Sequence, residues 1–180
     1  KAGDEIQWFL EEVAVVAAES EEQAEDAVRK IRAKFEKLPH VVKEMNLAEA
    51  ADRAKPEDEQ ITGDIKKGFD EAEVIHEGHY GLPVITHCCL EPHGCMAEWD
   101  GDQLTAWLST QAVSGAGQGF AQNLSIPAAN VRVRCDHMGG GFGSKFAADV
   151  WGVEAARLSK AANRPVKFML ERSAEMGSFQ

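Results

Sequence analysis

The segment Met138–Phe146, MGGGFGSKF, contains the residues whose types and spacing most favour chemistry. It places four glycines and one phenylalanine between an expected strand and an expected helix. Glycine lets a backbone approach a bound group closely, and successive backbone amides attract anions. Each glycine also costs backbone entropy on folding, so four of them exceed what a tight turn needs. The loop therefore favours contact with a ligand, with a plain strand-to-helix turn as the alternative.

Neither of the two common nucleotide-binding motifs fits this loop. A P-loop requires glycine where Ser144 stands, and Ser or Thr where Phe146 follows Lys145. The dinucleotide fingerprint started at Gly139 also requires glycine at position 144, and no clear acidic residue follows about 20 residues later. A nucleotide-phosphate site remains the weakest of the functional alternatives.

The cysteines and nearby histidines are the other residues that could do chemistry. The cysteines are too few for a disulfide scaffold, and they lack the C-x₂-C pairs typical of zinc and iron–sulfur sites. His87 and His93 lie close to them in sequence, but this spacing favours reduced, half-buried thiols over a metal cluster. We therefore predict no metal ligand in this chain. The cysteines are Cys88, Cys89, Cys95 and Cys135.

Composition limits the class of protein. The chain has 180 residues, enough for one domain with a piece of a neighbour, and a formal net charge of -11, which argues against nucleic-acid binding. No apolar run approaches the roughly 20 residues that cross a bilayer. The first residues, KAGDEIQWFL, include neither an initiator Met nor a signal peptide. We expect a fragment or processed chain, located in the cytoplasm.

The first part of the chain predicts a strand–helix–strand unit. Residues 13–18, VAVVAA, form an apolar, β-branched run typical of a buried strand. Ser20 begins a capping box, SEEQ, and apolar residues then follow at helical spacing, which predicts a helix over residues 20–32. A second strand is expected over residues 34–38. The charged stretch 48–60 indicates a linker.

The rest of the chain predicts alternating elements that must position the glycine loop. Expected helices cover residues 64–72, 112–124 and 145–161. Expected strands cover residues 73–80, 94–99, 104–109, 130–136 and 164–170. The predicted fold class is α+β, with mixed sheets and packed helices.

Four segments together resemble the large, molybdenum-cofactor subunit of the xanthine dehydrogenase/aldehyde oxidase family, in that family's order and approximate spacing. The first 45 residues resemble the end of its hammerhead domain. The resemblance implies a hammerhead tail over residues 1–48, a linker over 49–62, and the N-terminal part of a molybdopterin-binding domain over 63–180. The segments are 63–80, 86–111 (THCCLEPHGC…STQ), 126–145 (…MGGGFGSK) and 164–176.

The resemblance also implies roles for individual residues. Gln111 matches a glutamine that hydrogen-bonds near the oxo ligand of molybdenum, with a surface glutamine as the alternative. The loop that passes under the cofactor corresponds to Gly140, Gly141, Phe142 and Gly143. Phe142 further matches an aromatic residue bordering the substrate pocket, with an ordinary core phenylalanine as the alternative.

Other polar residues are expected to be structural or to lie at the surface. Glu91, in a Glu-Pro pair, is expected to shape the domain, and Arg172 and Glu175 are expected on a charged surface. His76, His79 and His87 are expected to be structural or solvent-facing.

Two departures from the family pattern limit what the chain can do. Purine-oxidising members carry a glutamate where this sequence has Phe146, so an aldehyde or apolar heterocycle is the expected substrate. The family's general base is a glutamate that lies beyond Gln180. This chain alone is therefore expected to be inactive.

The resemblance implies that the chain is part of a molybdenum-cofactor-dependent hydroxylase. The intact enzyme would oxidise an aldehyde or N-heterocycle with water-derived oxygen, using molybdenum–molybdopterin. Electrons would leave through iron–sulfur clusters, with FAD as a further candidate, on partner domains or subunits. The expected partners are the remainder of the large subunit, an iron–sulfur subunit or domain and a small-molecule substrate. The alternative is a non-catalytic binding or structural module that reuses the fold.

Overall fold

A computed structural model of the chain describes residues 3–6, 11–41, 47–50, 58–83 and 85–177. The chain divides into two compact units, which are described separately. The first, here called the sheet unit, combines Lys1–Ile31 with Pro83–Gln180, and the second covers Arg32–Leu82. Of the helices and strands described, the second unit holds α2 (Leu47–Ala50) and α3 (Ile65–Asp70).

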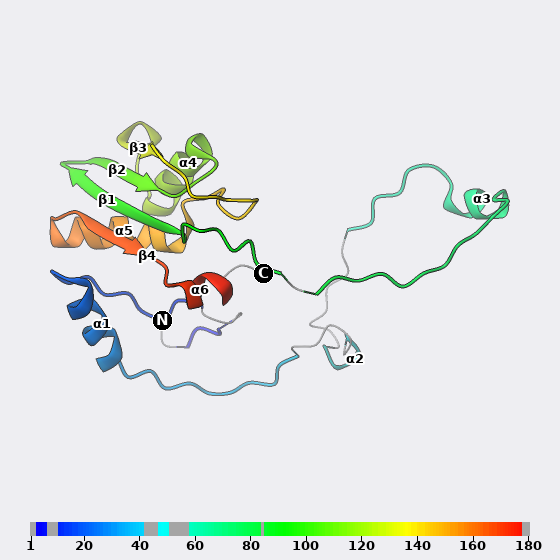
Figure 1. Ribbon diagram of the computed structural model, residues 1–180, viewed down its shortest axis with the longest axis horizontal. Coiled ribbons are helices and arrows are strands. Elements are labelled where there is room, and N and C mark those ends of the chain that lie inside the picture. Colours follow the sequence, from blue (N-terminus) through cyan, green and yellow to red (C-terminus); the bar gives the residue numbers. More distant parts are fainter. Residues whose placement is uncertain (1–2, 7–10, 42–46, 51–57, 84, 178–180) are drawn as a thin grey trace. The chain divides into compact units, whose positions relative to one another are not determined.

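A four-stranded sheet organises the sheet unit (Figure 1). The strand order is β3-β2-β1-β4; β1 pairs antiparallel with both β2 and β4, whereas β2 pairs parallel with β3. The hairpin between the first two strands turns at Gly101, whose φ of +58° suits glycine. The strands are β1 (Gly94–Asp100), β2 (Gln103–Leu108), β3 (Val131–Arg134) and β4 (Val166–Met169).

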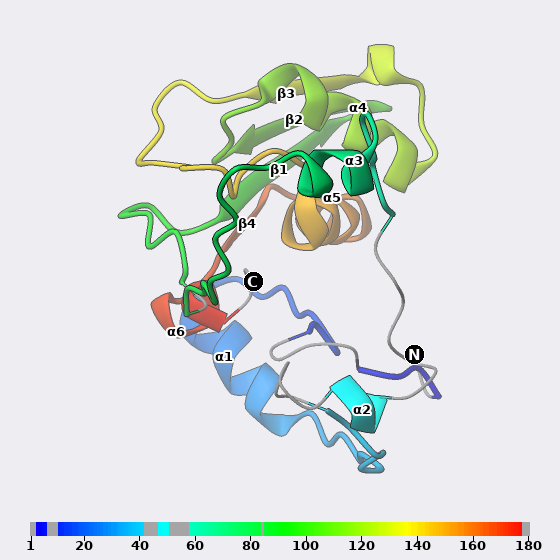
Figure 2. The ribbon, with the colours of Figure 1, turned by 90° about the vertical axis from the view of Figure 1, so that its right-hand side faces the viewer.

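Two helices form the core with this sheet. Helix α4 (Val113–Leu124) connects the parallel strands β2 and β3 through the short 3₁₀ helix η3 (Ala128–Asn130), and it packs on β3. Helix α5 (Asp149–Ala162) packs on β1 and β4 (Figure 2). Alternate strand residues face these helices, and the buried cluster includes Leu104, Leu108 and Phe120. The mixed sheet with packed helices confirms the predicted α+β class.

Most elements of the sheet unit lie where the sequence predicts them. The four strands and α4 overlap the predicted ranges, and α1 (Glu21–Lys30) follows the predicted cap. The Ser20 hydroxyl accepts a hydrogen bond from the Gln23 amide at 3.4 Å. In the second unit, α3 confirms the helix expected there, capped by the Asp64 carboxylate. Of the predicted linker, residues 51–57 lie outside the described residues.

Three predicted strands are wrong. Residues 13–18, 34–38 and 73–80 are described, and none of them forms a strand. Their apolar side chains are largely exposed, with Val13 at 52% and Phe35 at 65%. A β-strand needs a neighbour to satisfy its backbone amides and carbonyls. The described residues supply no such neighbour to these segments, so their apolar patterns alone do not produce strands.

Two further differences affect the glycine loop. The predicted helix 145–161 begins only at Asp149, because Lys145 is buried and bonded within the loop rather than placed on a helix surface. A short helix that the sequence did not predict, α6 (Arg172–Gly177), follows β4. Both differences result from contacts between segments far apart in the sequence.

Candidate functional site

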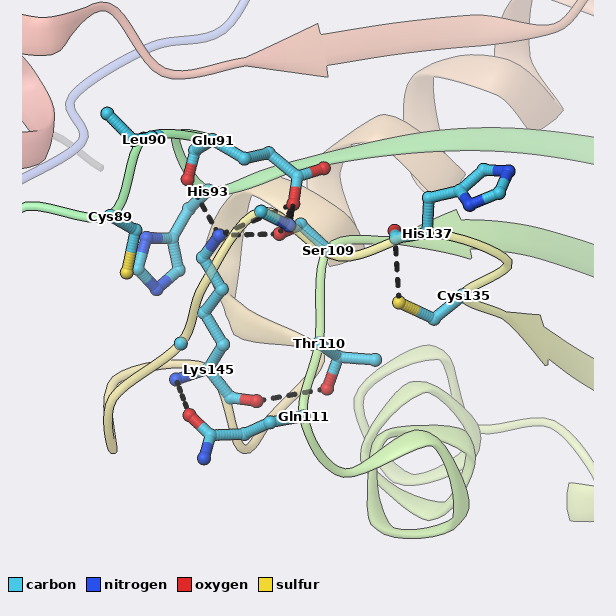
Figure 3. A network of polar contacts seen from close by, with 12 residues as sticks. Cys89, Leu90, Glu91, His93, Ser109, Thr110, Gln111, Cys135, His137 and Lys145 are labelled. Atoms are coloured by element: carbon cyan, nitrogen blue, oxygen red, sulfur yellow. Dashed lines mark hydrogen bonds and ion pairs between the residues drawn. The ribbon is translucent and has the colours of Figure 1, made fainter.

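The glycine loop, defined here as Gly139–Lys145, connects β3 to α5 and contacts two other segments (Figure 3). One is the stretch 89–93 that precedes β1, and the other is the stretch 109–111 that follows β2. Because β1 and β2 are antiparallel neighbours, the start of the first lies beside the end of the second. The sheet therefore brings both segments to the loop.

Gln111 is oriented by the loop backbone. Its side-chain oxygen Oε1 accepts hydrogen bonds from the amides of Gly143, at 3.0 Å, and Lys145, at 3.4 Å. Its own backbone amide donates to the Lys145 carbonyl at 2.9 Å. With Oε1 held in this way, the amide nitrogen Nε2 points away from the loop (Figure 3). No described residue accepts a hydrogen bond from Nε2, so Gln111 presents an oriented donor at the surface.

The glycines satisfy specific steric demands. A Cβ on Gly141 would lie 2.4 Å from Gln111 Oε1, and one on Gly139 would lie 2.4 Å from the Glu91 Cβ. Gly140 and Gly143 both have φ of +105°, which L side chains rarely adopt. Two of the glycines thus make room for side chains of the chain itself, and two allow the loop to turn.

Four of the seven backbone amides of the loop are engaged within the protein. The amide of Gly139 donates to Glu91, those of Gly143 and Lys145 donate to Gln111, and that of Ser144 donates to the Gly141 carbonyl at 2.9 Å. These amides are therefore not directed at an external phosphate. Together with the later start of α5, this disfavours a nucleotide-phosphate site.

Phe142 lies at the surface in a strained conformation. Its φ is +50°, in the left-handed region that costs a non-glycine residue about 1–2 kcal/mol, and 74% of the residue is exposed. The alternative of an ordinary core phenylalanine is therefore wrong. The loop thus carries an exposed aromatic ring at Phe142 and holds the Gln111 amide through the next residue, Gly143, so that both could contact a ligand on the loop.

Lys145 and Glu91 fix both ends of the loop. The Lys145 ammonium is fully buried and donates to the Glu91 carbonyl at 2.7 Å and to the Ser109 hydroxyl at 2.6 Å. The Glu91 carboxylate lies 3.8 Å from the same ammonium and accepts the Gly139 amide at 2.7 Å. Glu91 therefore shapes the domain as expected, whereas the burial of Lys145 was not foreseen.

The prediction of a charged surface holds for Arg172, which is exposed, but is wrong for Glu175, which is buried. Glu175 is 1% exposed, and its carboxylate contacts buried His93, with Oε1 2.9 Å from Nδ1. Arg172 donates to the carbonyls of Cys89 and Leu90 at 2.7 and 2.8 Å. The unpredicted helix α6 thus binds the stretch 89–93 through Arg172 and Glu175. No local sequence signal indicates these contacts.

The cysteines are free as predicted, but only Cys135 is half-buried: Cys88 is exposed, and Cys89 and Cys95 are buried. Burial raises the pKa of the Cys95 thiol to about 12. His76, His79 and His87 are exposed. Within the described residues, no group of three or more His, Cys, Asp or Glu could hold a metal ion.

Of two surface pockets, neither includes a residue of the glycine loop, Gly139–Lys145. A surface pocket of about 890 Å³ lies at the distal end of the hairpin, lined by Trp99, Asn123 and Arg157 among others. A smaller one of about 310 Å³ touches Glu91 on the open face of the sheet. Neither is lined by Gln111 or Phe142, and both of these residues are exposed.

Asp149, at the start of α5, gives the chain a pH-dependent stability. Burial raises the pKa of its carboxyl to about 6, with His93 opposing and Glu12 adding to the shift. The folded state then binds more protons than the unfolded state between about pH 4 and pH 6. The contribution of this group to the stability therefore falls as pH rises through that window.

We expect Asp149→Asn to stabilise the protein at pH 8 but not at pH 4. Asparagine tolerates the φ of +53° at this position and never ionises. After allowance for the partial exposure of the carboxyl, the gain at pH 8 is about 1 kcal/mol, or roughly 2–4 °C in Tm. Thermal unfolding at both pH values measures it. An equal difference at pH 4 and pH 8 would contradict the burial argument.

None of the helices in the described ranges is long and apolar enough to cross a membrane.

Comparisons with known proteins agree on a family. Residues 30–179 match the molybdopterin cofactor-binding domain. The chain is 34% identical over 172 residues to the aldehyde oxidoreductase molybdenum-binding subunit PaoC of Escherichia coli K12, covering 94% of this chain and 23% of that protein. It is 29% identical over 167 residues to xanthine dehydrogenase/oxidase of Gallus gallus, covering 91% of this chain and 12% of that protein.

A solved structure shows the same fold. The chain superposes on quinoline 2-oxidoreductase from Pseudomonas putida 86 with a TM-score of 0.70 and 26% identity, covering 88% of this chain and 21% of that one. The chain thus spans less than a quarter of the length of the relatives it matches. Because the family model covers most of the chain, we conclude that the chain belongs to the molybdopterin cofactor-binding domain family, which confirms its resemblance to the xanthine dehydrogenase/aldehyde oxidase large subunit.

Proposed function

We propose that this chain forms one wall of the cofactor site in a molybdenum-cofactor-dependent hydroxylase that oxidises an aldehyde or an N-heterocycle. The observation that carries the proposal is the orientation of Gln111. Two loop amides hold Oε1, so that Nε2 is a fixed donor directed away from the loop. A donor fixed before binding stabilises an oxygen ligand without a cost of reorganisation.

The residues present fit a molybdopterin cofactor of the kind the family binds. The cofactor carries oxygen atoms that accept hydrogen bonds, and Gln111 Nε2 has no acceptor among the described residues. The loop Gly139–Lys145 itself contains no Asp, Glu, Cys or His that could ligate the metal. The site therefore contacts the cofactor through hydrogen bonds and packing.

The cofactor, when bound, supplies the redox chemistry of the hydroxylation. Gln111 would donate a hydrogen bond to one of its oxygen atoms. Gly140, Gly141 and Gly143 would let the loop backbone pass close beneath it, and Phe142 would pack against the substrate with its exposed ring. Phe146, also exposed, offers no polar atom to a purine, which favours an aldehyde or apolar heterocycle.

We propose that the remaining parts of the cofactor site are supplied by other segments of the large subunit. We propose that residues 1–48 belong to a hammerhead-like domain, that 49–62 connect it, and that 63–180 begin the molybdopterin-binding domain. The exposed apolar side chains of segments 13–18 and 34–38 support packing against other parts of a large subunit. Iron–sulfur clusters, with FAD as a further candidate, would lie on partner domains or subunits, and the free cysteines are compatible with a cytoplasmic location.

The proposal is tested by metal analysis of the protein purified gently from its native source. Mass spectrometry of metals is expected to find about one molybdenum per chain, as a single cofactor site requires. Absence of molybdenum would overturn the proposal and favour a non-catalytic binding or structural module. Tight binding of ATP or NAD in its place would favour the nucleotide alternative.

Gln111→Leu is expected to reduce kcat/KM by about 100-fold, because a preorganised donor to a developing charge has an effect of that size. The overall fold should be retained because the side chain lies at the surface, although the Gly143 and Lys145 amides lose their acceptor. Steady-state kinetics on the aldehyde or heterocycle that the purified enzyme oxidises provides the measurement. Gln122→Leu is the matched control, because Gln122 is exposed on α4 and is expected to leave the kinetics unchanged. Equal kcat/KM values for Gln111→Leu and Gln122→Leu would show that Gln111 is not part of the active site.

A further inference from the structure

A buried pair, His93 and Glu175, connects helix α6 to the glycine loop. Both residues are 1% exposed. The Glu175 carboxylate accepts the His93 backbone amide at 2.8 Å and lies 2.9 Å from Nδ1 of its ring. The opposite ring nitrogen, Nε2, lies 3.0 Å from the carbonyl oxygen of Ser144, inside the loop. One imidazole ring therefore spans the distance between α6 and the loop.

The partners of the ring decide where its protons lie. A carbonyl oxygen can only accept, so Nε2 must carry a hydrogen and donate it to Ser144. On the other side of the ring, the hydrogen bond between Nδ1 and the Glu175 carboxylate requires one more proton, which lies between these two groups. The ring also meets the edge of Trp151, with centroids 5.4 Å apart and planes at 75°. This packing prevents the ring from turning to exchange its two partners.

The Ser144 carbonyl belongs to the same peptide group as the Lys145 amide. A trans peptide is planar, so its C=O and N–H point in opposite directions. His93 holds the carbonyl end of this plane, and the amide end donates to Gln111 Oε1 at 3.4 Å. Rotation of the plane would break both hydrogen bonds together. The ring of His93 and the side chain of Gln111 are thus coupled through a single peptide group.

We propose that His93 and Glu175 are positioning residues that orient the Gln111 amide through the Ser144–Lys145 peptide. Glu175 fixes the ring, the ring fixes the peptide, and the peptide fixes Oε1 of Gln111, which leaves Nε2 directed outward. The coupling itself is a property of the folded chain. Its consequence for catalysis rests on the proposed function of Gln111.

Three variants test this coupling by hydrogen–deuterium exchange of peptides covering residues 141–146 in the purified protein. Glu175→Ala and His93→Ala are expected to speed exchange of the Gly143 and Lys145 amides about tenfold relative to amides of β2, which serve as an internal reference for global unfolding. Glu175→Gln is expected to remain within about twofold of the unsubstituted protein. Its amide can donate to Nδ1 and accept the His93 backbone amide, so the ring keeps its hydrogen on Nε2.

If the two residues had only a structural role, the substitutions would change the exchange rates of the loop amides and of the β2 amides together. Glu175→Gln would then not restore slow exchange in the loop. Unchanged loop exchange in Glu175→Ala and His93→Ala, measured against β2, would overturn the proposal. Glu154→Ala, in a partly exposed pair with Arg157 on α5, is the control and should leave the loop unchanged. The exchange experiment does not depend on metal content. Its failure with molybdenum present would overturn the coupling alone, and its success with molybdenum absent would leave the coupling intact while overturning the proposed function.

Discussion

Replacement of Lys145 by methionine is expected to lower the free energy of unfolding by about 3 kcal/mol, and Tm by roughly 10 °C. Methionine keeps most of the side-chain volume but removes the buried ammonium. The Glu91 carbonyl and the Ser109 hydroxyl then lose a charged donor that lies 2.7 and 2.6 Å away. Breaking one side of a buried ionic contact leaves the other side desolvated without compensation. Thermal or urea unfolding of the purified protein measures the change.

An exposed lysine provides the matched control for this experiment. Lys66→Met removes the same charge from α3, where 84% of the Lys66 side chain is exposed and its ion pair with Asp70 is solvated. The expected change is about 0.5 kcal/mol or less. If Lys145→Met and Lys66→Met had equal effects, the buried network would not be a source of stability. A second expected sign is faster proteolysis at the glycine loop in Lys145→Met, because the ammonium anchors the C-terminal end of the loop.

The second large effect is expected from Gly141→Ala, on function rather than stability. The added methyl would lie 2.4 Å from Gln111 Oε1 and 2.5 Å from the Met138 Cε. Both atoms are at the ends of flexible side chains, so the fold can adjust and Tm should change by only a few degrees. The adjustment must move the Gln111 amide out of the two loop hydrogen bonds. We expect kcat/KM to fall about 100-fold, as for removal of the donor itself.

A glycine-to-alanine substitution at a second position distinguishes the effect on activity from the effect on stability. Gly115→Ala lies on α4, where the nearest atom to an added Cβ is the Phe146 carbonyl oxygen at 3.9 Å. A glycine-to-alanine change within a helix is expected to stabilise by about 0.5–1 kcal/mol and to leave activity unchanged. Full activity in Gly141→Ala would show that the position of Gln111 is not critical. A large fall in Tm would show instead that Gln111 and Met138 cannot move aside.

Local sequence patterns determined the elements whose signals are short-range. The Ser20 hydroxyl, three residues before the Gln23 amide, specified the start of α1 because a capping contact involves only neighbouring residues. The alternation in β1 and β2, with a turn at Gly101, specified the hairpin for the same reason. By contrast, the apolar run 13–18 did not produce a strand, because a strand depends on a partner that the run itself does not contain.

The glycine loop and Gln111 were also proposed as site residues from the sequence, through a combination of motifs rather than through periodicity. What the sequence could not show was the reason for each glycine. At Gly139 and Gly141 the reason is contact with Glu91 and Gln111, residues separated from them by tens of positions. The assignment of Phe142 to an exposed, left-handed position likewise required the structure.

The sequence by itself determined the family, the α+β class and the position of the loop, since these depend on composition, motifs and local propensity. Only the tertiary structure decided that Lys145, His93 and Glu175 are buried. Charged and polar residues are normally assigned to the surface, because burial without partners is costly. These three are buried because the sheet and α6 bring them partners from 36 to 82 residues away, and no local pattern encodes such a partner.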